Sequence, residues 1–305
     1  MYKKLSEIPY GYKPKVLFVG NGINRAYRDE SWDSFIKTLS KTSLSKEDED
    51  IYQKLPYPLR PVVITKDNVK DALKERAQDI IDTDLSSEQK KQYKDLCLTG
   101  VDAILTTNYT YDIEKSLCDD FSVKISKGSK YRVTSCDNNL KRDMCLHQYM
   151  SLPGIEPSVW HVHRECAKPD TMVLGHYYYG KLMSKFPKLT ADFLRRYTSH
   201  CKDKTPFVPK SWIDYFLLGD IYFVGFGLGF DETDIWWLLN WRKLHMNSVS
   251  KAYFFEARDI KNEMDQKAKF WMADTFDINV SNVFFEEKDY KNYYKKISKY
   301  LKGSL

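Results

Sequence analysis

The chain has 305 residues, of which 42% are hydrophobic and 15% aromatic, so it can bury a large core and does not have the composition of a disordered protein. Its net charge of +6, from 48 basic and 42 acidic residues, permits an anionic ligand but does not indicate nucleic-acid binding. No apolar run approaches the roughly 20 residues that span a bilayer, and no apolar signal core follows the N-terminus, so we expect a cytoplasmic protein.

The first predicted element is a short buried strand at residues 16–19, an apolar run typical of parallel sheets. It leads into Gly20, Asn21 and Gly22, where the chain can turn tightly and its backbone can approach a ligand. A helical pattern follows, with apolar residues at the spacing of one helix face: Trp32, Phe35, Ile36 and Leu39. Strand, glycine turn and helix together direct backbone N–H groups at a phosphate, although a plain strand-to-helix turn explains the same residues equally well.

A helical insertion is predicted at residues 41–98, between the first two strands of the sheet. Apolar residues from Val69 to Ile81 follow the period of an amphipathic helix, and a second helix is predicted at about 88–98. A dehydrogenase-type dinucleotide site has an acidic strand end about 20 residues beyond its glycines. Because residues 40–45 offer no such strand, the sequence disfavours hydride transfer.

The next predicted strand, residues 102–107, leads directly into Asn108. Residues at the carboxyl end of a strand face the ligand crevice in open α/β folds, and the Asn side chain both donates and accepts hydrogen bonds. A second interpretation is that Asn108 caps the helix predicted to follow it.

Three histidines lie within sixteen residues, at positions 161, 163 and 176. The period of two puts His161 and His163 on the same side of a predicted strand at 158–163, and a further strand is predicted at 172–176. No carboxylate or thiolate completes a recognised ligand spacing, and the six cysteines are scattered, so we expect no metal and free thiols. A buried structural role is the default for each histidine.

The second half of the chain adds helices and completes the sheet. A loop is predicted at 127–150 and a helical insertion at 182–215, followed by a strand at 220–224 that ends in the glycines Gly225 and Gly227. Further strands are predicted at 252–255 and 282–285, and an amphipathic helix at 290–300. The sequence therefore predicts a single α/β domain, residues 1–305, with a Rossmann-like, mostly parallel sheet, helices on both faces and two helical insertions.

Five segments, taken in order, resemble the sirtuin-like NADase family of prokaryotic anti-phage defence, close to its abortive-infection members. The segments are residues 20–24, 31–35, 106–110, 160–163 and 225–228. The resemblance implies a sirtuin-like Rossmann domain with NAD as the substrate. The zinc ribbon of deacetylating sirtuins, with its paired cysteines, is missing, which argues against protein deacetylation.

The resemblance also implies roles for individual residues. Asn108 and His163 would lie beside the nicotinamide ribose as catalytic residues. The contacts with the rest of NAD would come from Gly20, Asn21, Gly22, Asn24, Asp33, Thr107, Asp112, Gly225 and Gly227, with Arg25 as a charge partner of the diphosphate. The chain departs from the family pattern twice: Arg164 replaces a Gly, which leaves His161 as a rival catalytic residue, and Thr110 replaces an Asp, which moves the expected ribose contact to Asp112.

The activity implied is hydrolysis of NAD⁺ to nicotinamide and ADP-ribose by an effector that halts the infected cell. A non-catalytic sensor of NAD or ADP-ribose is the alternative, and a dehydrogenase is the third choice. The added helices, Trp236, Trp237 and the Tyr-rich tail predict a homo-oligomer or a complex with a separately encoded regulatory protein. A monomer that buries these aromatics in its core is the other possibility, and neither a membrane nor direct nucleic-acid binding is expected.

Overall fold

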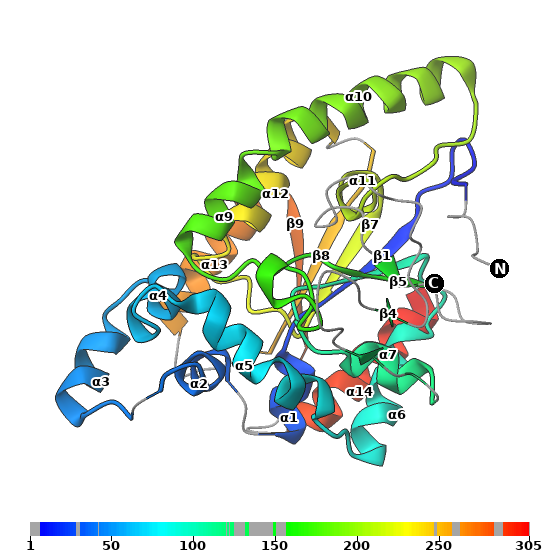
Figure 1. Cartoon of the computed structure of the whole chain (residues 1–305). Helices are drawn as coiled ribbons and strands as arrows, with labels where there is room; N and C mark the ends of the chain where they lie inside the picture. The colour runs from blue at the N-terminus through cyan, green and yellow to red at the C-terminus, as the bar shows by residue number, and fades with distance from the viewer. Residues whose placement is uncertain are drawn as a thin grey trace.

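The computed structural model of the chain describes residues 7–28, 31–41, 43–119, 121, 123–124, 132–133, 149–150, 157–246, 249–257, 263–283 and 289–304. One sheet organises the fold, with its strands in the order β5-β6-β2-β1-β7-β8-β9 (Figure 1). The strands are β1 Lys15–Val19, β2 Ala103–Thr106, β5 Tyr149–Met150, β6 Ser158–His161, β7 Asp220–Val224, β8 Ala252–Ala257 and β9 Ile278–Val283. All pair in parallel except β5, which is antiparallel to β6, so the predicted mostly parallel α/β sheet is confirmed.

The central strand β1 shows why the sheet is covered on both sides. Val16 and Phe18 pack into one apolar core, and Leu17 and Val19 pack into a second core across the sheet. All four side chains are fully buried, as expected for an apolar run inside a parallel sheet. A separate antiparallel pair is formed by β3 Val123–Lys124 and β4 Arg132–Val133.

Helices cover both faces of the sheet (Figure 1). The core that contains Phe18 includes residues of α9 His176–Met183, α10 Phe186–Asp203, α11 Trp212–Leu218, α12 Thr233–Met246 and α13 Glu263–Thr275. The core that contains Leu17 includes residues of α1 Gly22–Tyr27, α6 Ser87–Cys97, α7 Asp112–Leu117 and α14 Tyr290–Ser304. In α14, Tyr293, Tyr294, Ile297 and Leu301 face the core while the lysines stay outside, so this tail is the amphipathic helix that its sequence predicts.

A third group of helices lies beyond the carboxyl ends of the strands. It consists of α2 Trp32–Thr38, α3 Lys46–Gln53, α4 Arg60–Ile64 and α5 Val69–Asp82, with the short 3₁₀ turns η1 Tyr57–Leu59 and η2 Pro169–Thr171. Residues 41–98 therefore contain α3 to α6 between β1 and β2, and residues 182–215 contain α10 and parts of α9 and α11. Of the two predicted helices in 41–98, α6 packs on α7 and α14, on the sheet, while α5 packs on η2.

Two strand predictions are wrong in position. Residues 172–175 form no strand: they are a buried loop whose Val173 N–H donates to the carbonyl of His163 and whose Val173 carbonyl accepts from the Tyr109 hydroxyl. An apolar run can thus be buried without a ladder when a few hydrogen bonds satisfy its backbone. The last strand, β9, begins at Ile278, earlier than predicted, and residues 284–285 lie outside the described part of the chain.

The two histidines of the β6 region do not share a side, because the strand ends at His161. Arg164 has a left-handed backbone (φ 76°), and the turn from 162 to 164 redirects His163. His161 faces α7 and His163 faces α12, which cover opposite faces of the sheet. The expectation from the period of two therefore fails at the first residue past the strand.

Other sequence expectations lie partly outside the described residues. Of the predicted loop at 127–150, only β4 and β5 are described. The described cysteines (Cys97, Cys118, Cys166 and Cys201) are free thiols, as predicted.

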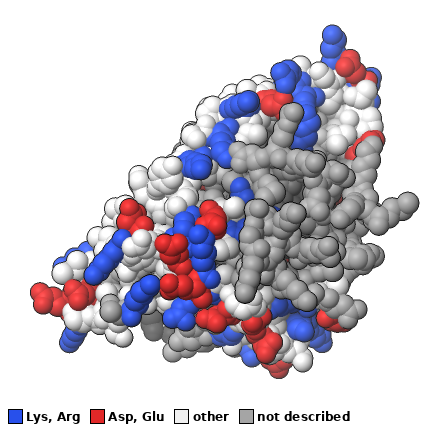
Figure 2. Space-filling model, viewed as in Figure 1, with Lys and Arg blue, Asp and Glu red and all other residues white. Residues whose placement is uncertain are grey.

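No described helix combines the length and the apolar sequence needed to cross a membrane. On the face seen in Figure 2, acidic and basic side chains are interspersed over α3, α4 and α5.

Candidate active site

The strand order creates a crevice between β1 and β7. From β1 the chain moves outward to β2 and β6, and then crosses back to β7 and continues to β8 and β9 on the other side. Ligands bind at such a reversal, outside the carboxyl ends of the strands. A pocket of about 1330 Å³ opens there, larger than the roughly 300–1,000 Å³ of most small-molecule sites. Its size suits an extended ligand such as a dinucleotide.

The loops that follow β1 and β7 are in direct contact, and glycine permits that contact. The Gly22 N–H donates to the Gly225 carbonyl at 2.7 Å. A Cβ on Gly20 would lie 2.5 Å from the Gly225 oxygen and from the Phe226 Cα, and one on Gly22 would lie 2.8 Å from the Gly225 Cα. Both glycines of the first turn are therefore required by packing within the protein, which is the plain turn interpretation of these residues.

Gly225 and Gly227 differ in what surrounds them. Gly225 has a left-handed backbone (φ 62°) and packs on Gly22 and Ile23. Gly227 lines the pocket, and a Cβ built on it would meet no atom within 4 Å. Asn21 and Thr107 also line the pocket, together with the exposed Arg25.

Asn108 lies at the floor of this crevice. Its side-chain amide donates to the Gly20 carbonyl at 3.3 Å, and its backbone N–H donates to the Thr106 hydroxyl. The side chain lines the pocket although the residue is 8% exposed. The capping interpretation is wrong, because α7 begins at Asp112 and its N-cap is Tyr111. The structure thus joins Asn108 to the first glycine turn through a single hydrogen bond.

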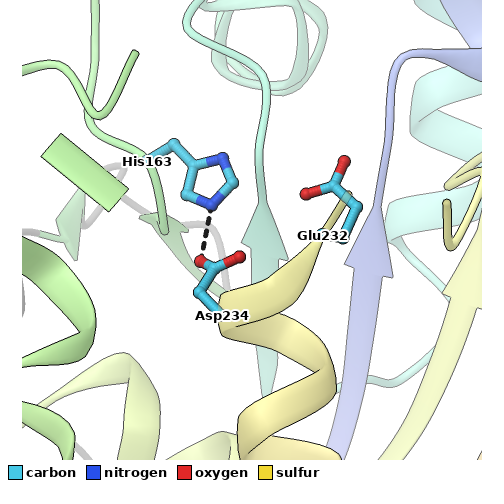
Figure 3. A group of neighbouring side chains, drawn as sticks. All are labelled: His163, Glu232 and Asp234. Atoms are coloured by element: carbon cyan, nitrogen blue, oxygen red, sulfur yellow. Dashed lines mark hydrogen bonds and ion pairs between the residues drawn. The ribbon is translucent and has the colours of Figure 1, made fainter. Parts of the chain in front are cut away.

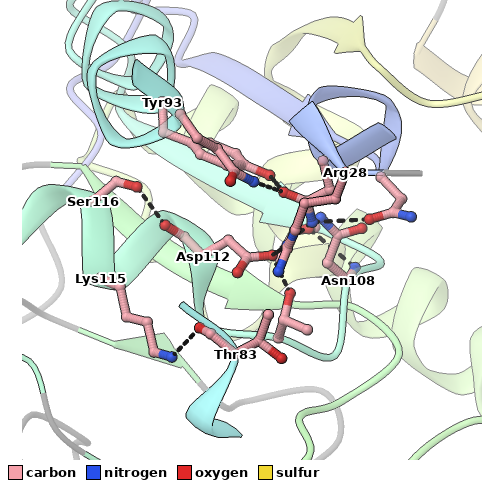
Figure 4. A network of polar contacts seen from close by, with 12 residues as sticks. Arg28, Thr83, Tyr93, Asn108, Asp112, Lys115 and Ser116 are labelled. Carbon is pink, nitrogen blue, oxygen red and sulfur yellow. Dashed lines mark hydrogen bonds and ion pairs between the residues drawn. The ribbon is translucent and has the colours of Figure 1, made fainter. Parts of the chain in front are cut away.

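Asp112 belongs to a buried polar network beside the pocket (Figure 4), which also includes the pocket-lining Asn24. The Asn24 amide donates to Asp112 Oδ2 at 2.6 Å, and Asn24 Oδ1 accepts from Gln89 and from the Tyr93 hydroxyl. Asp112 Oδ2 also accepts from the Thr110 hydroxyl, and Arg28 lies 3.4 Å away. Both residues are 1–2% exposed, so their polar atoms tie α1 to α6 and α7.

Asp33 does not face the pocket. It lies in the first turn of α2 and forms ion pairs with Arg60 at 2.8 Å and with Lys37 at 3.1 Å. Burial opposes ionisation, but the hydrogen bonds from Lys37, Gln53 and Arg60 lower the pKa of the carboxyl below its usual value. This residue fastens α2 to α4. Its neighbours Ser31, Trp32, Ser34 and Phe35 do line the pocket.

His163 lines the pocket and is held by a carboxylate from the opposite side of the crevice (Figure 3). Its Nε2 lies 2.8 Å from Oδ2 of Asp234, in the first turn of α12, and the two side chains are 3% and 0% exposed. Because the carboxylate accepts the Nε2 proton, Nδ1 is the nitrogen of the neutral ring that can take up a proton. Burial alone would lower the pKa of His163, but Asp234 and Glu232 reverse this and raise it above its usual value.

His161 has a different environment. Its Nδ1 lies 2.8 Å from the Asn108 carbonyl, and its Nε2 lies 2.7 Å from Oε1 of Glu114. Burial opposes protonation, but the Glu114 carboxylate raises the pKa of His161 to about 9. The ring is therefore a buried cation at neutral pH. It supports the backbone of Asn108 and does not line the pocket, which His163 does.

Helices of the 41–98 insertion form one wall of the pocket. Tyr57, Pro58, Pro61 and Ile80 line it beside Trp32 and Phe35 of α2. The Trp32 ring stacks on Phe35 with centroids 5.3 Å apart and contacts Tyr109, the residue after Asn108, at 5.4 Å. At the β8 side the lining includes Glu256, which forms an ion pair with Lys269 at 3.2 Å, and tyrosines of α14.

Among the described residues, one group has the chemistry of a metal site. His163, Glu232 and Asp234 offer ligand atoms that all lie within 4.8 Å of one another. Glu232 and Asp234 lie about 70 residues after His163 in the chain. Ligand spacings near the histidines could therefore not reveal these two carboxylates. The Nε2–Oδ2 hydrogen bond between His163 and Asp234 already satisfies one nitrogen and one oxygen of this group.

Comparison with models of known protein families gives no match, and comparison with curated protein sequences gives none. Sequence reasoning missed Glu232 and Asp234. The available signal was their position: they follow the glycine-rich end of β7, directly before and within the first turn of a helix.

Proposed function

We propose that this protein is an NAD⁺ hydrolase that cleaves the bond between nicotinamide and ribose. The observation that carries the proposal is the pocket at the β1–β7 reversal, which brings Asn108 and the His163–Asp234 pair together in a space large enough for a dinucleotide. The ordered resemblance to sirtuin-like NADases supports the choice of substrate. A non-catalytic NAD sensor does not need a histidine, oriented by a carboxylate, on the pocket wall.

The residues suit the chemistry. Nicotinamide leaves NAD⁺ as a neutral molecule because the electron pair of the C1′–N bond neutralises its cationic ring, so no strong acid is needed. The ribose passes through an oxocarbenium-like state, and water attacks C1′ and releases a proton. His163 takes that proton at Nδ1, Asp234 orients the ring and stabilises its cation, and Asn108 positions the water or the ribose hydroxyls. His161 supports Asn108 from behind.

The biological context is also part of the proposal. By its resemblance, the protein would act in the cytoplasm as an abortive-infection effector that depletes NAD, and a homo-oligomer or a separately encoded regulatory protein would restrain it. No metal is needed for the steps above, since the leaving group is already activated. Asp33 and Asp112 would act on the pocket only through the elements they fasten, whereas Asn24 also lines it.

The test is to incubate the purified chain, alone and with the product of the neighbouring gene, with NAD and to measure nicotinamide and ADP-ribose. We expect both products in equal amounts, and we expect Asn108→Ala to lower turnover about a hundredfold or more with the fold retained. Binding of NAD without release of nicotinamide under either condition would favour the sensor. Turnover close to that of wild type in folded Asn108→Ala would remove Asn108 from the mechanism.

A further inference from the structure

Glu232 is a carboxylate without a protein partner at the wall of the pocket. It directly precedes α12 and lines the pocket, and its Oε2 is buried with no hydrogen-bond partner in the described structure. The described residues also give it no ion pair with a lysine or arginine. Buried carboxylates are normally hydrogen-bonded or paired, so an unpartnered one that faces a pocket points to a ligand with complementary charge.

The groups around Glu232 are acids, phenols and one histidine. Asp231 and Asp234 flank it in the chain, and His163 faces it from the end of β6 (Figure 3). Tyr109 and Tyr179 face it from the β2 loop and from α9. Burial and the two aspartates raise the pKa of Glu232 to about 7, against the opposing effect of His163. The carboxylate therefore changes charge near neutral pH.

The reaction proposed for this pocket creates a positive charge on the ribose, close to Glu232. When the C1′–N bond breaks, the bonding electrons leave with nicotinamide and the ribose carries the charge until the C1′–O bond to water forms. His163, within 4.8 Å of Glu232, accepts the proton of that water, so the reacting carbon lies within reach of both side chains. A fixed carboxylate in a site of low dielectric constant stabilises such a cation more than water does.

Resting on the function proposed above, we propose that Glu232 is a further catalytic residue whose ionised carboxylate faces the ribose of the scissile bond and stabilises its developing positive charge. His163, oriented by Asp234, accepts the proton, whereas Glu232 stabilises the positive charge on the sugar. Two groups must then be deprotonated for turnover: Glu232 as a carboxylate and His163 as a neutral base.

The first experiment measures kcat and KM of the wild type and of Glu232→Gln from about pH 5 to about pH 9. On the acidic side, log kcat of the wild type should rise with a slope of about two, one proton from each group. Glu232→Gln should lose about a hundredfold in kcat with little change in KM, and its slope should fall to about one. Asp231→Asn removes a neighbouring charge from the same pocket and serves as the control, with the slope of the wild type. A folded Glu232→Gln with the kcat and slope of the wild type overturns the proposal.

A second experiment does not depend on turnover. In the Asn108→Ala background, binding of NAD⁺ is compared with binding of NADH, whose nicotinamide ring is uncharged. We expect Glu232→Gln to reduce the preference for NAD⁺ over NADH by about tenfold. Equal loss of both ligands, or an unchanged preference, overturns the role of Glu232 and leaves the hydrolase proposal standing. Failure of the wild type to bind either dinucleotide overturns both.

Discussion

At the scale of single residues, the two histidines show how environment assigns roles to identical side chains. His161 has both ring nitrogens engaged, and Glu114 raises its pKa to about 9, so it is already protonated at neutral pH and cannot serve as a base. His163 has one nitrogen held by Asp234 and lines the pocket. The sequence left His161 and His163 as alternative catalytic residues, and their positions in the structure favour His163.

We accordingly expect His163→Ala to abolish nicotinamide release and His161→Ala to retain it. The second variant leaves Glu114 buried without its partner, which should lower the free energy of unfolding by about 3–5 kcal/mol. Turnover per folded molecule, with the folded fraction taken from circular dichroism, is the measurement that compares them. An active His163→Ala beside an inactive, folded His161→Ala would exchange the two roles.

Glu232 should also leave a signature in stability. Its pKa is raised by burial from an ordinary value of 4.5 to about 7 in the folded chain, so between these values the unfolded chain has lost the proton and the folded chain keeps it. The unfolded state then binds fewer protons, and the stability of the wild type falls as pH rises through this window.

Glu232→Gln lacks this loss. The free energy of unfolding of Glu232→Gln should exceed that of the wild type by an amount that grows from about pH 4.5 to pH 7 and reaches about 1–2 kcal/mol. This is less than the energy that corresponds to the full pKa difference, because the side chain is partly exposed to the pocket. Denaturant unfolding at several pH values measures it. A variant less stable than the wild type at pH 8 would show that the carboxylate has a partner in the fold.

At the scale of elements, the crevice depends on two loops that touch. The turn after β1 and the turn after β7 meet at Gly20, Gly22 and Gly225, and the Gly22 N–H is donated to the Gly225 carbonyl. Because this N–H already donates to a carbonyl of the protein, it is not available to bind a phosphate. The glycines of the first turn allow two loops to pack, and the open backbone at Gly227 is the better candidate for close approach of a ligand.

A pair of alanine substitutions separates these roles. Gly20→Ala places a methyl group 2.5 Å from backbone atoms of the β7 loop and should lower the free energy of unfolding by about 3 kcal/mol. Gly227→Ala meets no atom within 4 Å, so it should unfold like the wild type while weakening NAD binding. Thermal unfolding and calorimetric titration with NAD measure both effects. Equal stability of the two variants contradicts the packing role of Gly20.

At the scale of the whole molecule, the helices added to the sheet complete the pocket. The wall formed by Tyr57, Pro58, Pro61 and Ile80 comes from residues 41–98, and Lys70 of α5 donates to the backbone carbonyls of Pro169 and Met172 near the β6 end. The aromatic residues that suggested an interface are partly accounted for inside the chain. Trp236 is 6% exposed, and Tyr293 and Tyr294 are buried. The exposed apolar residues include Tyr290 and Tyr300 of the same tail and, outside it, Phe230, Leu244 and Trp271, the last 81% exposed.

The prediction of a homo-oligomer or a regulatory complex now rests on these exposed residues. Phe230 and Trp271 line one shallow depression, and large exposed apolar groups in one place are typical of interfaces. Light scattering should give a mass above 36.0 kDa, either for the chain alone or with its neighbour in the genome. Trp271→Ser should reduce that mass, whereas Tyr177→Ser, at another exposed aromatic, should not. A monomer that ignores its neighbour and hydrolyses NAD freely would refute gating by a partner.

The sequence alone determined the features that depend on neighbouring residues. Apolar runs predicted β1, β2 and β7 almost to the residue, and helical periodicity predicted α5, α6 and α14. Both predictions succeed because the spacing of apolar residues along the chain shows which strand or which helix face is buried. The glycine turn and Asn108 were found for the same reason, since both follow directly on predicted strands.

Only the tertiary structure decided which side chains meet. The pairing of His163 with Asp234 spans 71 residues, and that of His161 with Glu114 spans 47, and no local pattern encodes either distance. The end of β6 at His161 turned two histidines of one predicted face toward different helices. The strand order brought the β1 and β7 loops together, and packing of the helices buried Asn24 and Asp112 and paired Asp33 with Arg60, contacts that their sequence neighbours do not reveal. Contacts of this kind depend on how elements pack, and packing is settled only when the whole chain has folded.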